Sequence, residues 1–80
     1  MKITIEKKEK VEIEVTLPTY RRSSHHFYMI DENKSICVYN GTEKNYSIEI
    51  NEYMMRFPFN YEECSQELFE EMYNQVKSKL

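Results

Sequence analysis

Residues 25–39, HHFYMIDENKSICVY, carry the clearest structural signal in the chain. Two short runs rich in apolar residues flank the polar sequence DENK, which is the pattern of a β-hairpin. The register that closes this turn pairs Ile30 with Ser35 and Tyr28 with Cys37. Because side chains alternate along a strand, one face then holds Phe27, Met29, Ile36 and Val38. The other face holds His26, Tyr28, Ile30, Cys37 and Tyr39.

Upstream of this hairpin, apolar and charged residues alternate from Lys2 to Leu17. Such alternation predicts two half-buried strands around Ile3–Ile5 and 11–17, joined by a charged turn at residues 7–10. Pro18 ends the second strand, and residues 19–24 are predicted to be a polar connection.

Downstream, residues 46–51 form a fifth predicted strand with Tyr46, Ile48 and Ile50 on one face. A turn at Asn40-Gly41 would carry the isoleucines past the end of the partner strand. We therefore expect a longer loop through Asn45, which places Ile48 near Val38.

The last third of the chain changes to a helical period, with apolar residues three and four apart. This spacing predicts an amphipathic helix of nearly 20 residues that ends near Leu80. Asn60 is its expected N-cap, with Glu63 three residues further on. The apolar residues of the stripe are Tyr61, Cys64, Leu68, Phe69, Met72, Tyr73, Val76 and Leu80.

These elements predict one small globular domain, residues 1–80, of the α+β class. Its expected architecture is a single antiparallel sheet of about five strands, packed on one C-terminal helix in the order βββββα.

Composition narrows the function classes. The chain has 80 residues and a net charge of −3, from 11 basic and 14 acidic residues. An acidic balance argues against general binding to a nucleic-acid duplex. The sequence has no secretory leader and no apolar run of about 20 residues, which predicts a soluble cytoplasmic protein with no membrane contact. Cys37 and Cys64 are then expected to be free thiols.

One helix covers one face of a sheet, so the second face is expected to offer His26, Tyr28 and Tyr39 as contacts. The connector after residue 51 holds a second group of bulky apolar residues. This connector either folds over an open end of the core or forms a contact surface for a partner. The connector residues expected to bind a partner are Tyr53, Met54, Met55 and Phe57.

The leading hypothesis is therefore a non-enzymatic protein-interaction module that binds another protein or itself, as a homodimer. Codon usage implied by abundant Lys, Asn, Ile and Tyr fits an accessory or regulatory protein of a bacterium, phage or mobile element. No cofactor and no metal site is expected, because no spacing of His and Cys residues typical of metal ligands occurs.

Two alternatives remain open. Nucleic-acid binding would use the Arg21-Arg22 pair with Tyr20 and His25, within a segment that extends to Tyr28. A cysteine-based activity would use Cys37, with His26 as a diagonal neighbour across the hairpin.

Overall fold

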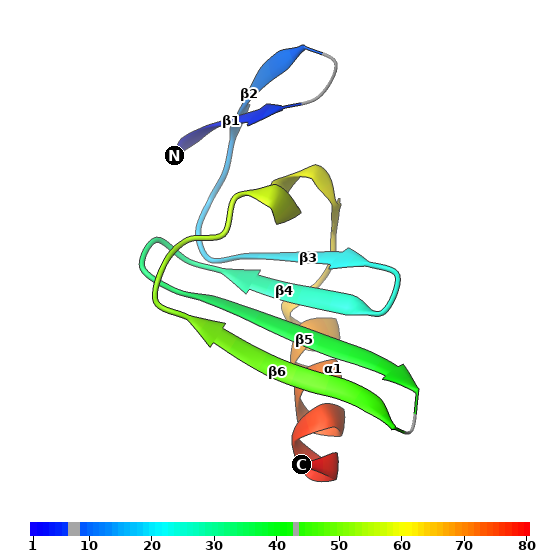
Figure 1. Ribbon diagram of the computed structural model, residues 1–80. Coiled ribbons are helices and arrows are strands. Elements are labelled where there is room, and N and C mark those ends of the chain that lie inside the picture. Colours follow the sequence, from blue (N-terminus) through cyan, green and yellow to red (C-terminus); the bar gives the residue numbers. More distant parts are fainter. Residues whose placement is uncertain (7–8, 43) are drawn as a thin grey trace.

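The structure is a computed structural model that describes residues 1–6, 9–42 and 44–80 (Figure 1). Its elements, in chain order, are β1 (Lys2–Glu6), β2 (Lys10–Glu14), β3 (Thr19–Ser23), β4 (His26–Ile30), β5 (Ser35–Thr42), β6 (Asn45–Asn51), the 3₁₀ helix η1 (Phe57–Asn60), β7 (Glu62–Glu63) and α1 (Gln66–Lys79).

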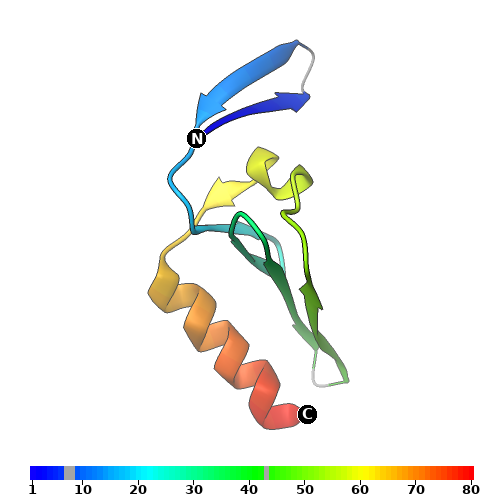
Figure 2. The ribbon, with the colours of Figure 1, turned by 90° about the vertical axis from the view of Figure 1, so that its left-hand side faces the viewer.

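The α+β architecture is confirmed: strands precede a C-terminal helix, which packs on an antiparallel five-stranded sheet. The strand order is β6-β5-β4-β3-β7. The first hairpin differs from the prediction, because β1 and β2 form a separate two-stranded sheet. Figure 2 shows α1 along one side of the large sheet and the β1–β2 hairpin beyond its end. The charged turn predicted at residues 7–10 includes residues 7 and 8, which lie outside the described residues.

The central hairpin has the predicted register, with Ile30 opposite Ser35 and Tyr28 opposite Cys37. Its two faces are also as predicted. Phe27 and Val38 are buried beneath α1 in a helix-side core that includes Phe69 and Val76.

The opposite face of the sheet contributes to a second core, which we call the outer core. The β1–β2 hairpin and the segment around η1 complete it, since α1 lies on the other face. Its buried members are Ile3, Ile5, Val15, Tyr28, Ile30, Met55 and Phe59.

The pairing of β5 with β6 places Val38 opposite Ile48, as predicted. The expected long loop is not observed, because β5 continues through Gly41 to Thr42, which faces Asn45. A register shift between Asn40 and Thr42 absorbs the extra residue. Residue 43 lies outside the described residues.

The polar connection expected at residues 19–24 is instead strand β3. It pairs with β4 along its whole length, from Thr19 opposite Ile30 to Ser23 opposite His26. Its sequence, TYRRS, lacks apolar alternation, so local pattern does not reveal it. The backbone groups of β4 need partners on both sides, and that requirement selects the neighbouring segment.

The helix is shorter than predicted and begins at Gln66, with Ser65 as its N-cap. The Ser65 hydroxyl accepts a hydrogen bond from the Leu68 amide at 3.1 Å. Upstream, residues 62–63 pair with β3, and the Cys64 amide donates to the Tyr20 carbonyl at 3.0 Å. The backbone groups of residues 62–64 are used in these sheet hydrogen bonds, so α1 begins only after them, at Gln66.

Candidate interaction surface

Aromatic side chains contact one another on the face of the sheet opposite α1. The His26 ring centroid lies 4.6 Å from that of Tyr39 and 6.2 Å from that of Tyr28. The Phe57 ring meets Tyr28 edge-on at 5.7 Å. Tyr61 closes the group, 5.7 Å from Tyr28 and 6.0 Å from Phe57. We call these five residues the aromatic surface.

Sheet register explains why these rings meet. His26 and Tyr28 are two residues apart on β4 and so share a face. Tyr39 lies directly opposite His26 on β5. Phe57 opens η1 and Tyr61 directly follows it, so one short turn brings both rings over β4.

The aromatic surface extends from the core to solvent. Tyr28 is 5% exposed, and burial is the largest of the causes that raise its pKa to about 12. Phe57 is 52% exposed, and the other three residues are half-buried. The expectation that Tyr28 is accessible to a partner is therefore corrected, because η1 covers it. Its ring supports the more exposed ones.

The other residues expected to bind a partner lie in or beside the connector between β6 and η1, and they differ in exposure. Met55 is buried in the outer core and Met54 packs against that core, as in the alternative in which the connector closes an open end. Tyr53 is 58% exposed, and Phe57 joins the aromatic surface. Met55 is thus corrected from a contact to a core residue, because its amide is bound to the buried Ser35 hydroxyl.

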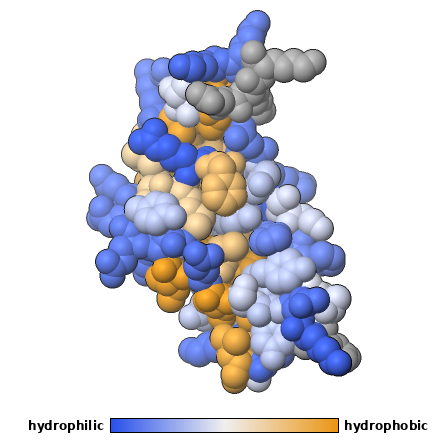
Figure 3. All heavy atoms as spheres, in the orientation of Figure 1, coloured by the Kyte–Doolittle hydropathy of each residue, from blue (hydrophilic) through white to orange (hydrophobic). Residues whose placement is uncertain are grey.

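A hollow of about 360 Å³ opens beside Phe57. Thr4 and Ile5 of β1 line one side, while Arg56 and Asn60 line the other with Phe57. In Figure 3, which views the sheet from the side opposite α1, the more apolar side chains run down the middle of the face to its lower margin, with polar side chains on either side. The hollow combines apolar walls with a guanidinium and an amide.

Sequence reasoning did not assign Tyr61, Arg56 and Asn60 to a surface, and it treated Asn60 and Tyr61 as the start of the helix. Pro58 could have indicated this difference, because proline favours the first turn of a helix. Pro58 lies in the first turn of η1, so a short helix at residues 57–60 fits the sequence there.

The expected nucleic-acid residues do not form one basic patch. Arg21 is 8% exposed and faces the outer core, where its guanidinium lies 3.3 Å from Glu63 and 5.7 Å from the Phe59 ring centroid. Arg22 is exposed, but it follows Arg21 on a strand and so points to the opposite face. Tyr20 packs on Phe69, with ring centroids 5.5 Å apart.

His25 is exposed beyond the end of β3. Of the four expected nucleic-acid residues, Arg22 and His25 are therefore the exposed ones. Burial of Arg21 removes half of the arginine pair that motivated this alternative.

Burial disfavours the thiolate form of both cysteines. Both cysteines are free and half-buried. Burial raises the pKa of the Cys37 thiol, and the Glu49 carboxylate adds to this effect. Burial also raises the pKa of Cys64, although nearby Arg22 and Arg21 oppose it. A raised pKa favours the protonated, less reactive form at neutral pH.

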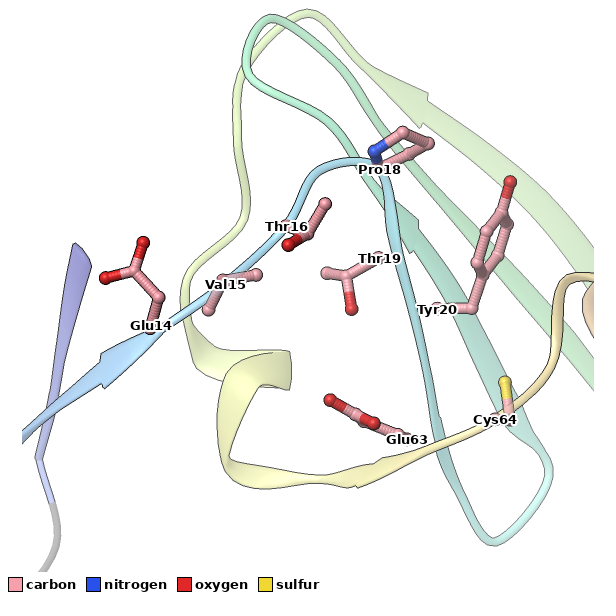
Figure 4. Close-up of a pocket in the computed structure, with 8 residues that line it drawn as sticks. All are labelled: Glu14, Val15, Thr16, Pro18, Thr19, Tyr20, Glu63 and Cys64. Carbon is pink, nitrogen blue, oxygen red and sulfur yellow. The ribbon is translucent and has the colours of Figure 1, made fainter. Parts of the chain in front are cut away.

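A second hollow, of about 330 Å³, adjoins Cys64 at the edge formed by β7 (Figure 4). The carboxylates of Glu14 and Glu63 and the hydroxyl of Thr19 give it a polar lining. Among the described residues that line it there is no histidine to act as a base. The described residues that line it are Glu14, Val15, Thr16, Pro18, Thr19, Tyr20, Glu63 and Cys64.

No family model, curated protein or solved structure matches this chain. Within residues 1–6, 9–42 and 44–80, no group of three or more potential ligands is placed to hold a metal ion. The helices in the same residues are too short or too polar to cross a membrane. The fold and the surface define a small α+β protein whose most distinctive feature is a cluster of aromatic rings.

Proposed function

We propose that this protein is a small non-catalytic accessory protein that binds another protein through the aromatic surface. The observation that supports this function is the direct edge-on contact between the buried Tyr28 ring and the exposed Phe57 ring. Aromatic side chains of this kind dominate binding energy at protein interfaces.

Ring packing lowers the cost of binding. Phe57 already rests against Tyr28 and Tyr61, so a partner does not have to order a free side chain. Pre-ordering of this kind saves roughly 0.5–1.5 kcal/mol for each side chain that would otherwise lose its rotamer freedom.

The hollow beside Phe57 supports a proposal for the chemistry of the partner. Its apolar wall, formed by Ile5 and Phe57, suits one bulky apolar side chain. The Arg56 guanidinium and the Asn60 amide supply donors for a main-chain carbonyl or a carboxylate. The proposed ligand is therefore a protein segment with an apolar side chain beside an acidic or carbonyl oxygen.

Comparison of two exposed aromatic residues tests this function. The substitution Phe57→Ser removes the outer ring, whereas Tyr53→Ser removes an equally exposed ring outside the cluster. Each variant and the wild type would capture proteins from lysate of the source organism, with and without nuclease treatment. Calorimetry would then measure binding of the purified partner.

We expect Phe57→Ser to weaken the purified partner's binding at least tenfold, since interface anchors contribute about 2 kcal/mol or more. Tyr53→Ser should change it less than threefold. Equal effects of the two substitutions, at unchanged circular dichroism, would rule out the aromatic surface. A partner captured only without nuclease treatment would contradict direct protein binding and favour binding to nucleic acid.

A further inference from the structure

Strand β6 forms one edge of the five-stranded sheet, because it pairs with β5 and ends the strand order. It lies at the lower margin of the sheet in Figure 1. Natural edge strands commonly carry lysine, proline or a bulge that prevents pairing with another chain. The β6 sequence, NYSIEIN, has no lysine or proline, and Glu49 is its one charged residue.

The edge is also apolar on the side that faces α1. Tyr46, Ile48 and Ile50 alternate along that side, and Ile50 is 58% exposed. Leu80, just beyond α1, is 74% exposed. Figure 3 shows hydrophobic side chains gathered along this lower margin, beside β6 and the C-terminal end of α1.

We propose that β6 pairs antiparallel with β6 of a second copy of this chain, with Ile48 opposite Ile48. A two-fold axis perpendicular to the sheet relates the two copies. The five-stranded sheets then join into one continuous sheet of ten strands, with both helices on the same face. Antiparallel pairing satisfies the outward-pointing backbone groups of both edges.

The sequence around β6 is self-complementary in this register. Tyr46 faces Ile50 of the second copy, so two apolar pairs flank the central Ile48 pair on the α1 side. Just beyond the ends of β6, Lys44 faces Glu52 of the second copy. The dimer therefore contains two opposite-charge pairs, one on each side of its axis.

Other registers lose this complementarity. A shift of the centre to residue 49 brings two Glu49 carboxylates opposite each other, which is unfavourable. A centre at residue 47 leaves Ile50 facing Lys44. Pairing of residues from different faces is incompatible with the two-fold axis, because that axis keeps both α1 helices on one side.

The self-complementarity favours a second copy over an unrelated peptide. An arbitrary strand could satisfy the backbone hydrogen bonds, but it would not supply the lysine and glutamate at matching positions. This dimer leaves the two aromatic surfaces on the face away from the helices, so the inference is independent of the proposed protein partner.

A charge swap in the full chain tests both the interface and its register. Lys44→Glu and Glu52→Lys each replace two attractive pairs per dimer with two repulsive ones, whereas the double substitution restores attraction. Lys10→Glu makes the same charge change at an exposed position of β2, in the separate two-stranded sheet, and serves as the control. Sedimentation equilibrium would measure the dimer dissociation constant, and circular dichroism would confirm folding.

We expect the wild-type chain to dimerise, and each single substitution at the interface to raise the dissociation constant about tenfold. The double substitution should return it to within threefold of the wild-type value, and Lys10→Glu should leave it unchanged. Ile50→Lys should abolish the dimer. A wild-type chain that stays monomeric at about 1 mM would overturn the inference. A dimer that is insensitive to Ile50→Lys, or is not rescued by the double substitution, would do so as well.

Discussion

The buried hydroxyl of Ser35 accepts a hydrogen bond from the Met55 amide at 2.7 Å. The same hydroxyl donates to the Tyr53 carbonyl at 2.8 Å. One side chain at the start of β5 therefore holds the connector against the sheet and fixes where η1 begins. Because Phe57 follows two residues later, this contact links the sheet to the aromatic surface.

Replacing Ser35 with alanine should destabilise the fold and loosen the connector. The Met55 amide and the Tyr53 carbonyl would lose a buried partner, which costs about 1–3 kcal/mol. Urea unfolding would measure this loss, and hydrogen exchange should accelerate at residues 53–57. Ser47→Ala, at an exposed position of β6, is the control and should change stability by less than about 0.5 kcal/mol. Equal stability of both variants would show that the connector is held by other contacts.

Arg21→Ala should destabilise the protein much more than Arg22→Ala. The Arg21 guanidinium donates to the Tyr61 carbonyl at 3.2 Å and packs over Phe59, so its loss removes packing as well as a hydrogen bond. We expect a cost of about 2–3 kcal/mol in the free energy of unfolding. The ion pair with the exposed Glu63 should add little to this cost.

The exposed neighbour Arg22 provides the matched control for this experiment. Arg22→Ala should change the free energy of unfolding by less than about 0.5 kcal/mol. If the two substitutions had equal effects on urea unfolding, the structural role of Arg21 would be excluded.

Gly41→Ala should alter the aromatic surface while leaving the fold intact. Gly41 does not adopt a positive φ, so its backbone accepts alanine. An added Cβ would lie 2.5 Å from the Tyr39 hydroxyl oxygen and would push this ring away from its position beside His26. We expect a change in stability below about 1 kcal/mol and clear shifts of the His26 and Tyr39 ring resonances. Unchanged ring resonances would show that Tyr39 does not rest on Gly41.

Alkaline pH should destabilise the protein through Tyr28. Its pKa is raised by burial from 10.0 to about 12 in the folded state. Below pH 10 the phenol is protonated in both states, so its contribution to stability is fully present. Between pH 10 and about 12 the unfolded chain ionises first, and the free energy of unfolding should fall by about 2–3 kcal/mol.

Urea unfolding at several pH values would measure this loss, with Tyr28→Phe as the comparison. The Phe variant should lose less stability across that range, because it has no phenol to ionise. Both chains would carry Cys37→Ser, because the raised pKa of the Cys37 thiol depends on the neighbouring Tyr28 phenol. Cys64, whose pKa is also raised, then affects both chains alike. Parallel pH profiles would therefore show that Tyr28 titrates normally.

Local sequence patterns predict some members of the aromatic surface but not all of them. Hairpin register predicted that His26 and Tyr39 share a face, and composition drew attention to Phe57. The spacing of Tyr61 from the following apolar residues fits a helical period, so the sequence predicts it within the helix. Its true position depends on the pairing of β7 with β3, which is a contact between residues about 40 positions apart.

The sequence by itself determined the α+β class, the central hairpin with its register, and the C-terminal helix. Each of these depends on periodicity and turn residues within a short window. Only the tertiary structure decided that TYRRS is a strand, that the first hairpin forms its own sheet, and that Tyr28 and Met55 are buried. These features arise because exposed strand edges and the uncovered sheet face must find partners, and residues distant in sequence supply them.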